Sequence, residues 1–158
     1  MSSEGWTIEK VLKTGLSMEE GANKLYTNAS GMAKDPGSKQ LLKELAADEA
    51  KHMDYFKRVL ADPMKELDKY RGEGKRRIVN LRIGDPLKEQ PLSRDATYQD
   101  TLIFAIKSEK TANEFYSALA SLLKGEPLGS MLESFAAIEM GHKEKLEREY
   151  DEVVLRDN

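Results

Sequence analysis

An internal repeat at an offset of 90 residues restricts the fold of this chain more than any other feature. Residues 18–26 (MEEGANKLY) align with residues 108–116 (SEKTANEFY), and residues 42–52 (LKELAADEAKH) align with residues 132–142 (LESFAAIEMGH). Because both alignments have the same offset, the second half of the chain repeats the plan of the first. We therefore expect two similar halves that pack about a pseudo-two-fold axis.

Each half contains two stretches in which apolar residues recur at steps of three and four, the spacing of an amphipathic helix. Asp35-Pro36-Gly37 and Gly125-Glu126-Pro127 interrupt the pattern within each half, and Gly and Pro end helices. Short turns join antiparallel helices, so each half reads as an αα-hairpin. We predict an all-α four-helix bundle, a single domain over residues 1–158, with these parts: helices at about 5–34, 38–61, 97–124 and 128–154, and a long crossover over 62–96.

The crossover and the amino terminus carry three weaker signals. Val79, Leu81 and Ile83 alternate with polar residues, which indicates a short extended segment that could pair with its copy in a second chain. The run Lys75-Arg76-Arg77 favours a solvated loop, with a docking site for an acidic electron donor as the alternative. Trp6 could cap the core or lie in a subunit contact.

Composition excludes several classes of function. With 25 Lys and Arg against 28 Asp and Glu, the net charge of −3 gives no reason to expect a nucleic-acid partner. No apolar run approaches the roughly 20 residues of a membrane span, and the first residues do not resemble a signal peptide. A cytoplasmic protein without a membrane partner is therefore expected. The absence of cysteine excludes disulfides, iron–sulfur clusters, rubredoxin-type iron and thiol catalysis.

Six ionisable residues occupy positions in the apolar stripes, where such residues are rare. Each histidine follows a glutamate by three residues, which places the pair on one helix face, and a further glutamate stands 30 residues before each pair. The midpoints of these 30-residue spacings fall at residues 34 and 124, beside the two turns, so the members of each hairpin should lie at the same height. The predicted layer consists of Glu19, Glu49, His52, Glu109, Glu139 and His142.

Four buried carboxylates cost several kcal/mol each unless they are paired or protonated, and no Lys or Arg lies on the stripes. Two divalent cations would balance their charge of −4. Oxygen and nitrogen ligands without sulfur suit iron or manganese, with zinc as a further alternative. A glutamate from each of two helices with Glu-x-x-His from each of the other two is a known di-iron arrangement. Taken singly, each histidine reads better as a core residue bonded to the preceding glutamate; two in matched layers do not.

With these residues, the chain resembles the rubrerythrin-like branch of the ferritin-like di-iron carboxylate superfamily. The resemblance implies that Glu49 and Glu139 bridge two iron ions and that the other four residues are terminal ligands. No haem, flavin or iron–sulfur cluster is expected. The chain departs from rubrerythrin proper because it lacks the cysteine-rich rubredoxin domain. It also has Ala112 where an extra glutamate is found, so a more symmetric site is expected.

The resemblance also implies an activity: reduction of hydrogen peroxide, with O2 as another oxidant, using electrons from a separate protein such as a rubredoxin. It further implies a homodimer. The alternatives are a ferroxidase for iron handling, a manganese catalase-like enzyme and a non-catalytic metal-binding structural bundle.

A pair of tyrosines and a pair of alanines lie near the predicted layer in the sequence. Tyr26 and Tyr116 follow Glu19 and Glu109 by seven residues, on the same helix faces; core packing is favoured over hydrogen bonds to ligand carboxylates. Ala22 and Ala112 either leave room for metal and oxidant or let the helices approach closely.

Overall fold

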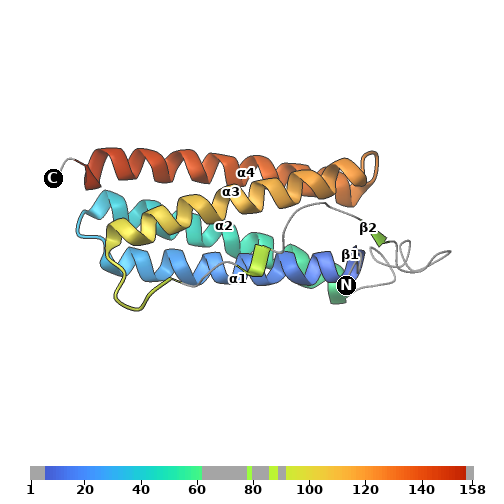
Figure 1. The fold of residues 1–158 in the computed structure, drawn as a ribbon, viewed down its shortest axis with the longest axis horizontal. Helices are drawn as coiled ribbons and strands as arrows, with labels where there is room; N and C mark the ends of the chain where they lie inside the picture. The colour runs from blue at the N-terminus through green and yellow to red at the C-terminus, as the bar shows by residue number, and fades with distance from the viewer. Residues whose placement is uncertain (1–5, 62–77, 80–85, 89–91, 156–158) are drawn as a thin grey trace.

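Four long helices lie side by side in the computed structural model, which describes residues 6–61, 78–79, 86–88 and 92–155 (Figure 1). The turns of the two hairpins lie at opposite ends of the bundle, as expected for two halves related by a pseudo-two-fold axis. The predicted all-α four-helix bundle is confirmed. The helices are α1 (Ile8–Met32), α2 (Pro36–Ala61), α3 (Tyr98–Leu122) and α4 (Pro127–Glu149), and α4 continues into a π-helical turn, η4 (Tyr150–Val154).

Local chemistry explains where the first helix of each hairpin begins. The α1 helix begins three residues later than predicted, because Thr7 is extended and its side chain accepts a hydrogen bond from Lys10 N at 3.0 Å. The α3 helix begins after Thr97, which forms a capping box with Asp100: each side chain accepts a hydrogen bond from the other residue's backbone N–H. These caps satisfy amide groups that have no partner inside the helix.

The second helix of each hairpin begins at a proline. Pro36 and Pro127 are the first residues of α2 and α4, a position where the missing N–H costs nothing. Gly125 in the second turn has a φ of 89°, which disfavours any residue with a Cβ atom. A Cβ atom on Gly129 would lie 2.2 Å from the carbonyl oxygen of Leu123, so the close approach of α4 to this turn also requires glycine.

The described parts of the crossover are short. A 3-10 turn, η3 (Pro86–Lys88), and a two-residue strand, β2 (Ile78–Val79), belong to it. β2 pairs antiparallel with β1 (Trp6–Thr7), so the described start of the predicted extended segment pairs within its own chain. Leu81, Ile83, the run Lys75-Arg76-Arg77 and the side chain of Trp6 lie outside the described residues.

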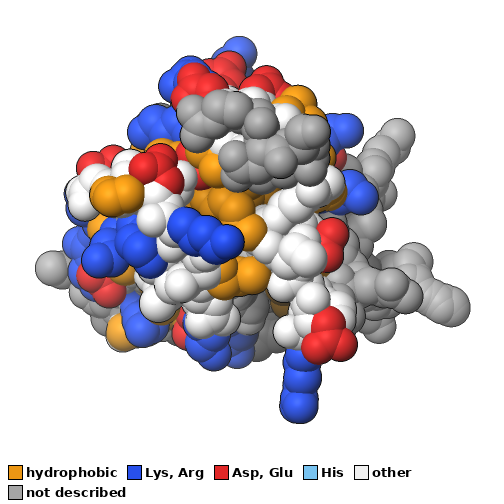
Figure 2. All heavy atoms as spheres, turned by 90° about the vertical axis from the view of Figure 1, so that its left-hand side faces the viewer, with side chains coloured by type: hydrophobic (Ala, Val, Ile, Leu, Met, Phe, Trp, Pro, Cys, Tyr) orange, Lys and Arg blue, Asp and Glu red, His pale blue; other side chains and the backbone are white. Residues whose placement is uncertain are grey.

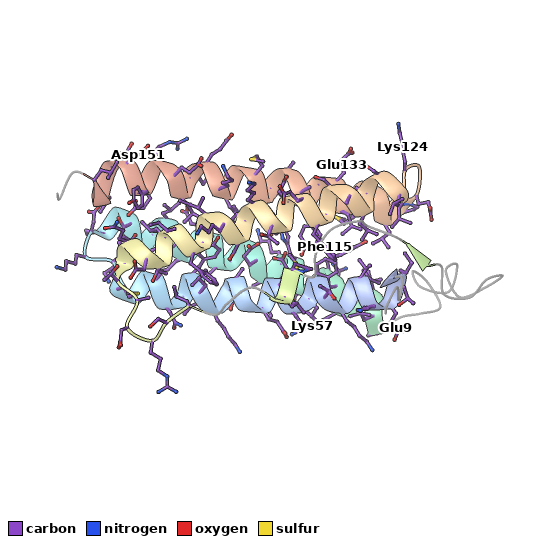
Figure 3. The ribbon with its side chains drawn as sticks, in the orientation of Figure 1. Glu9, Lys57, Phe115, Lys124, Glu133 and Asp151 are labelled. Carbon is purple, nitrogen blue, oxygen red and sulfur yellow. The ribbon has the colours of Figure 1, made fainter. Side chains whose placement is uncertain are left out.

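Charged side chains such as Lys124 and Glu133 lie on the outside of the bundle, whereas Phe115 is fully buried (Figure 3). No helix in the described residues is long and apolar enough to cross a membrane. The buried apolar residues form two clusters, one towards each end. The cluster beside the α3–α4 turn, called here the aromatic end, includes Ile8, Leu12, Phe56, Val59, Phe115, Tyr116, Leu119, Leu123, Leu128, Leu132 and Phe135.

The other cluster, beside the α1–α2 turn, is smaller and is called here the alanine-rich end. Figure 2 looks onto this end, where apolar side chains form the centre and charged side chains surround it. Its buried members are Tyr26, Ala29, Ala33, Leu42, Leu45, Ala46, Leu102, Ala105 and Leu146. The six ionisable residues predicted from the sequence lie on the helix turns between the two clusters.

Candidate metal centre

All four helices contribute to one buried layer of ionisable side chains between the two ends, called here the metal layer. α1 and α3 each supply one glutamate, and α2 and α4 each supply a glutamate and a histidine one turn later. These side chains are between 0% and 4% exposed. The structure therefore brings together every residue of the predicted layer: Glu19, Glu49, His52, Glu109, Glu139 and His142.

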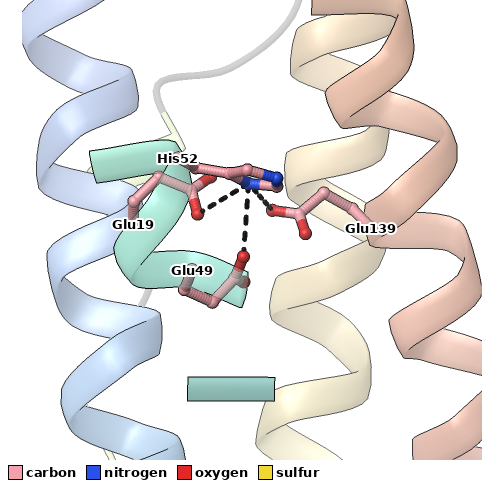
Figure 4. Close-up of side chains that lie close together, drawn as sticks. All are labelled: Glu19, Glu49, His52 and Glu139. Carbon is pink, nitrogen blue, oxygen red and sulfur yellow. Dashed lines mark hydrogen bonds and ion pairs between the residues drawn. The ribbon is translucent and has the colours of Figure 1, made fainter. Parts of the chain in front are cut away.

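The contacts around the first histidine show how tightly the layer is packed (Figure 4). Nδ1 of His52 lies 3.2 Å from Glu19 Oε1, 3.3 Å from Glu49 Oε1 and 4.0 Å from Glu139 Oε2. Four ligand atoms from three different helices thus surround one point.

The contacts around the second histidine repeat this pattern. Nδ1 of His142 lies 3.2 Å from Glu109 Oε2, 3.2 Å from Glu139 Oε1 and 3.8 Å from Glu49 Oε2. Glu49 and Glu139 belong to both groups, which is the position expected of two bridging ligands. The contacts that the two Nδ1 atoms make with the glutamates therefore have the symmetry expected from the sequence.

The carboxylates of this layer fit metal ions better than they fit one another. Both oxygens of Glu49, Oε1 of Glu109 and Oε1 of Glu139 are buried without a hydrogen-bond partner. No lysine or arginine among the described residues is buried, so no side-chain cation other than the histidines can balance the four carboxylates. Buried oxygens without donors are costly. Their ligand atoms lie within 4.8 Å of one another, so two divalent cations would satisfy them.

Without metal, the layer must hold protons instead. Burial raises the pKa of Glu49 and Glu139 well above the ordinary value, and the neighbouring carboxylates raise it further. Burial opposes charge on His52 and His142, but their contacts with glutamates outweigh it and raise the pKa of both imidazoles. Burial likewise opposes charge on Glu19, yet its hydrogen bond with His52 lowers the pKa of this carboxyl. Metal ions would displace these protons.

Hydrogen bonds from two tyrosines connect the two halves of the metal layer. The hydroxyl of Tyr26 on α1 donates a hydrogen bond to Glu109 Oε2 on α3. The hydroxyl of Tyr116 on α3 donates to Glu19 Oε2 on α1 at 2.5 Å. Their position in the sequence favours core packing, and in the structure both residues are buried in the core and also hydrogen-bonded to the carboxylates. Burial and the adjacent carboxylates raise the pKa of both hydroxyls well above 10, so the tyrosines stay protonated.

A cavity of about 870 Å³ reaches the metal layer between α1 and α3. Its lining includes Glu19, Glu109, the small side chains Ala22 and Ala112, and Leu87 of η3. Larger side chains at the two alanine positions would narrow the route to the carboxylates. The alanines therefore leave room beside the layer, which is one of the two roles considered for them from the sequence.

Sequence reasoning missed three polar residues beside the layer. Asn23 and Asn113, 90 residues apart, donate hydrogen bonds to the carbonyl oxygens of Ala46 and Ala136, each at 2.8 Å, and so join the two helices of each hairpin. The repeat could have revealed this pair, since both asparagines lie in the aligned segments. Asp48 contacts His142 from another hairpin, and no spacing within the sequence indicates that contact.

Comparisons with known proteins agree with this architecture. A structure described as a ferritin-like diiron-carboxylate protein from Thermotoga maritima is 20% identical, with a TM-score of 0.76; the match covers 96% of this chain and 99% of that one. A hypothetical protein from Pyrococcus furiosus is 24% identical, with a TM-score of 0.71, covering 92% of this chain and 89% of that one. Both matches establish the fold.

Sequence comparison adds the family. No functionally curated protein matches the chain significantly. The family model for rubrerythrin matches residues 10–93, more than half of the chain, and this range contains Glu19, Glu49 and His52. The second hairpin repeats the same residues at the same offset. The chain belongs to the rubrerythrin family.

Proposed function

We propose that this protein is a di-iron peroxidase, which reduces hydrogen peroxide with electrons from a separate donor. The observation that carries the proposal is the metal layer itself: four buried glutamates and two buried histidines, with buried carboxylate oxygens that lack donors. Membership of the rubrerythrin family supports a redox role for such a centre. The cavity between α1 and α3 supports access by a small oxidant.

Each residue of the layer has a place in this proposal. Glu49 and Glu139 would bridge the two ions, while Glu19 with His52 and Glu109 with His142 would complete the two half-sites. When bound, two ferrous ions supply the two electrons that, with two protons, convert one peroxide molecule to two of water.

The residues around the layer keep the carboxylates in position and admit the oxidant. Tyr26 and Tyr116 hold the outer carboxylates Glu109 and Glu19 by hydrogen bonds from the opposite helix. Burial and the neighbouring carboxylates raise the pKa of both hydroxyls, so they can donate these hydrogen bonds at neutral pH. Ala22 and Ala112 leave the route from the cavity to the layer open.

The amino-acid composition supports a separate source of electrons. The chain has no cysteine, so it has no iron–sulfur or rubredoxin-type relay of its own. A separate protein such as a reduced rubredoxin would return the ferric pair to the ferrous state, and the homodimer expected from the family remains a prediction.

The test is anaerobic loading with ferrous iron, followed by metal analysis and by peroxide additions with and without reduced rubredoxin. We expect two irons per chain, oxidation of both by one peroxide, and continued consumption of peroxide when the donor is present. Glu133→Ala, an exposed position on α4, serves as the control and should behave like the wild type.

Other outcomes would overturn the proposal in distinct ways. Oxygen release without a donor from manganese-loaded protein, with no turnover by the iron form, would indicate a catalase. Continued oxidation of added ferrous iron without donor-dependent turnover would indicate a ferroxidase. Bound metal that peroxide does not change would indicate a structural site, and a folded protein that binds no metal would remove the centre altogether.

A further inference from the structure

The two halves of the metal layer differ at the outer nitrogen of the histidines. Nε2 of His142 lies 3.0 Å from Oδ2 of Asp48, a half-buried residue on α2 that directly precedes Glu49. The position 90 residues later is Ile138, which directly precedes Glu139 and whose side chain has no atom that can accept a hydrogen bond. The repeat therefore provides a carboxylate for one histidine and a hydrocarbon side chain at the matching place for the other.

A different contact holds the second imidazole. The ring of His52 stacks on Phe135, with ring centroids 4.0 Å apart and an interplanar angle of 25°. The residue that corresponds to Phe135 in the first half is Leu45. Stacking restricts the orientation of a ring but leaves the location of its proton open, whereas a hydrogen bond to a carboxylate sets both.

The inner contacts do not create this difference. Nδ1 of His52 faces Glu19, Glu49 and Glu139, and Nδ1 of His142 faces the equivalent set: Glu109, Glu139 and Glu49. Both histidines therefore present Nδ1 to three carboxylates at comparable distances. The contact with Asp48 stands apart from this shared pattern.

We propose that Asp48 is a positioning residue that makes the two half-sites unequal, so that the half-site of His142 binds metal more tightly and fills first. Asp48 accepts a hydrogen bond from the Nε2–H of His142. The Nδ1 lone pair of this histidine is therefore directed at the space between Glu109 and Glu139. The hydrogen bond also makes that nitrogen a stronger ligand. Carboxylates in this role typically change metal affinity by about 10- to 100-fold. Because the Asp48 side chain is 41% exposed, we expect the lower end of that range.

This inference rests on the proposed metal centre but not on peroxide reduction, so it can be tested with zinc. The chain contains two histidines, so a long-range proton–nitrogen spectrum of 15N-labelled protein shows the signals of two imidazole rings. When wild-type protein is titrated with zinc, we expect the Nδ1 signal of His142 to shift at half an equivalent per chain, well before that of His52. The Nε2–H of His142 should also exchange slowly with solvent, while that of His52 exchanges fast.

The repeat offers matched variants. Asp48→Ile places the residue of the second half in the first, and we expect the two rings to respond to zinc together. Ile138→Asp should give His52 its own carboxylate and also equalise the half-sites. The double variant should exchange the order, so that His52 responds first. Asp48→Asn, which keeps an accepting oxygen without the charge, should give an intermediate result.

Two results would overturn the inference. One is simultaneous filling of both half-sites in the wild type; the other is an unchanged order in Asp48→Ile protein that keeps its helix content and melting temperature. Failure of the folded wild type to bind zinc or ferrous iron would instead overturn the metal centre, and the proposed function with it. Peroxide turnover plays no part in these measurements.

Discussion

The two ends of the bundle correspond to each other through the 90-residue repeat, yet they bury different chemistry. At the aromatic end, three matched positions hold Ile8, Val59 and Leu128, all buried. At the alanine-rich end, the same positions hold Tyr98, Glu149 and Ser38. There the hydroxyls of Ser38 and Tyr98 both donate to Glu149 Oε2, the latter at 2.8 Å. One end thus excludes water with hydrocarbon, and the other closes with a small hydrogen-bonded cluster.

A second pair of matched positions shows how each end fills its space. At the aromatic end Gly15 faces Phe56, and a Cβ atom on the glycine would lie 2.8 Å from Cζ of the ring. At the alanine-rich end the matched residues are Ala105 and Leu146. The larger side chain, Phe56, is therefore matched with glycine, and the smaller one, Leu146, is matched with alanine.

The metal layer between the ends behaves differently, because all six of its residues are the same in both halves. A metal site requires particular ligand atoms at particular positions, whereas a packed end requires a filled volume and satisfied polar groups. The halves could therefore diverge at the ends while the layer stayed the same. The following predictions test this contrast, in order of decreasing effect.

The largest effect should come from the bridging glutamates. Glu49→Ala and Glu139→Ala should each abolish binding of both metals. The loss of metal stabilisation should be about 4 kcal/mol for each of the two sites when the free metal is a thousand times its Kd. Metal analysis and thermal denaturation with and without ferrous iron or zinc measure this.

Without metal, the same variants should melt at or above the wild-type temperature, because each removes a buried carboxyl group. Unchanged metal content in either variant would contradict the bridging role. Retention of one of the two metals in either variant would also contradict it.

The next effect separates the two ends. Leu128→Ala should lower the free energy of unfolding by about 2–4 kcal/mol, because it leaves a cavity at the aromatic end. The matched change at the other end, Ser38→Ala, removes one hydrogen bond to Glu149 and should cost about 1 kcal/mol. Urea unfolding of the metal-free proteins measures both, and equal losses would mean that the ends do not differ as described.

A smaller effect, with a change of sign, should come from Gly15. Gly15→Ala should destabilise the wild type, because the new methyl group collides with the ring of Phe56. In a Phe56→Leu background, which copies the matched pair of the other end, the same change should stabilise by about 1 kcal/mol, since alanine is the better helix former. A double-mutant cycle in urea provides the test, and an equal effect in both backgrounds would remove the claim that the pair is coupled.

The last prediction concerns pH, not a substitution, and distinguishes the layer from both ends. Burial raises the pKa of Glu49 and Glu139 above 4.5, so the folded metal-free protein holds protons that the unfolded chain releases. Their contribution to stability is complete below pH 4.5 and is lost as pH rises through the folded-state pKa. The raised pKa of His52 and His142 acts in the same direction above pH 6.5. The lowered pKa of Glu19 acts oppositely, but its contribution is lost below pH 4.5.

We therefore expect the melting temperature of the metal-free protein to fall between about pH 5 and pH 8. The zinc-loaded protein should not show this fall, because deprotonated ligands bind metal more tightly as pH rises. Parallel melting curves with chelator and with zinc measure the difference. A rise in the chelated sample over this range would show that the layer does not hold protons in the absence of metal.

Much of this molecule can be read from residue spacing. The stripes locate four helices to within a few residues, and equal distances from each turn place Glu19 beside Glu49 and Glu109 beside Glu139. These are contacts within a hairpin, where one short turn sets the register of two helices. Contacts between hairpins are less accessible to such reasoning. Tyr26 lies on the same helix face as Glu19, yet its hydrogen bond goes to Glu109 on the other hairpin.

The sequence by itself therefore determined the number of helices, the pairing within each hairpin and the six residues of the metal layer, because helical periodicity and turn position depend on local chain geometry. The tertiary structure decided how the hairpins face one another. Only the packing of α2 against α4 brings Asp48 to His142, and only the packing of α1 against α3 joins each tyrosine to the opposite glutamate. These contacts depend on how the helix surfaces of the two hairpins fit against each other, and side-chain volumes across the whole interface set that fit.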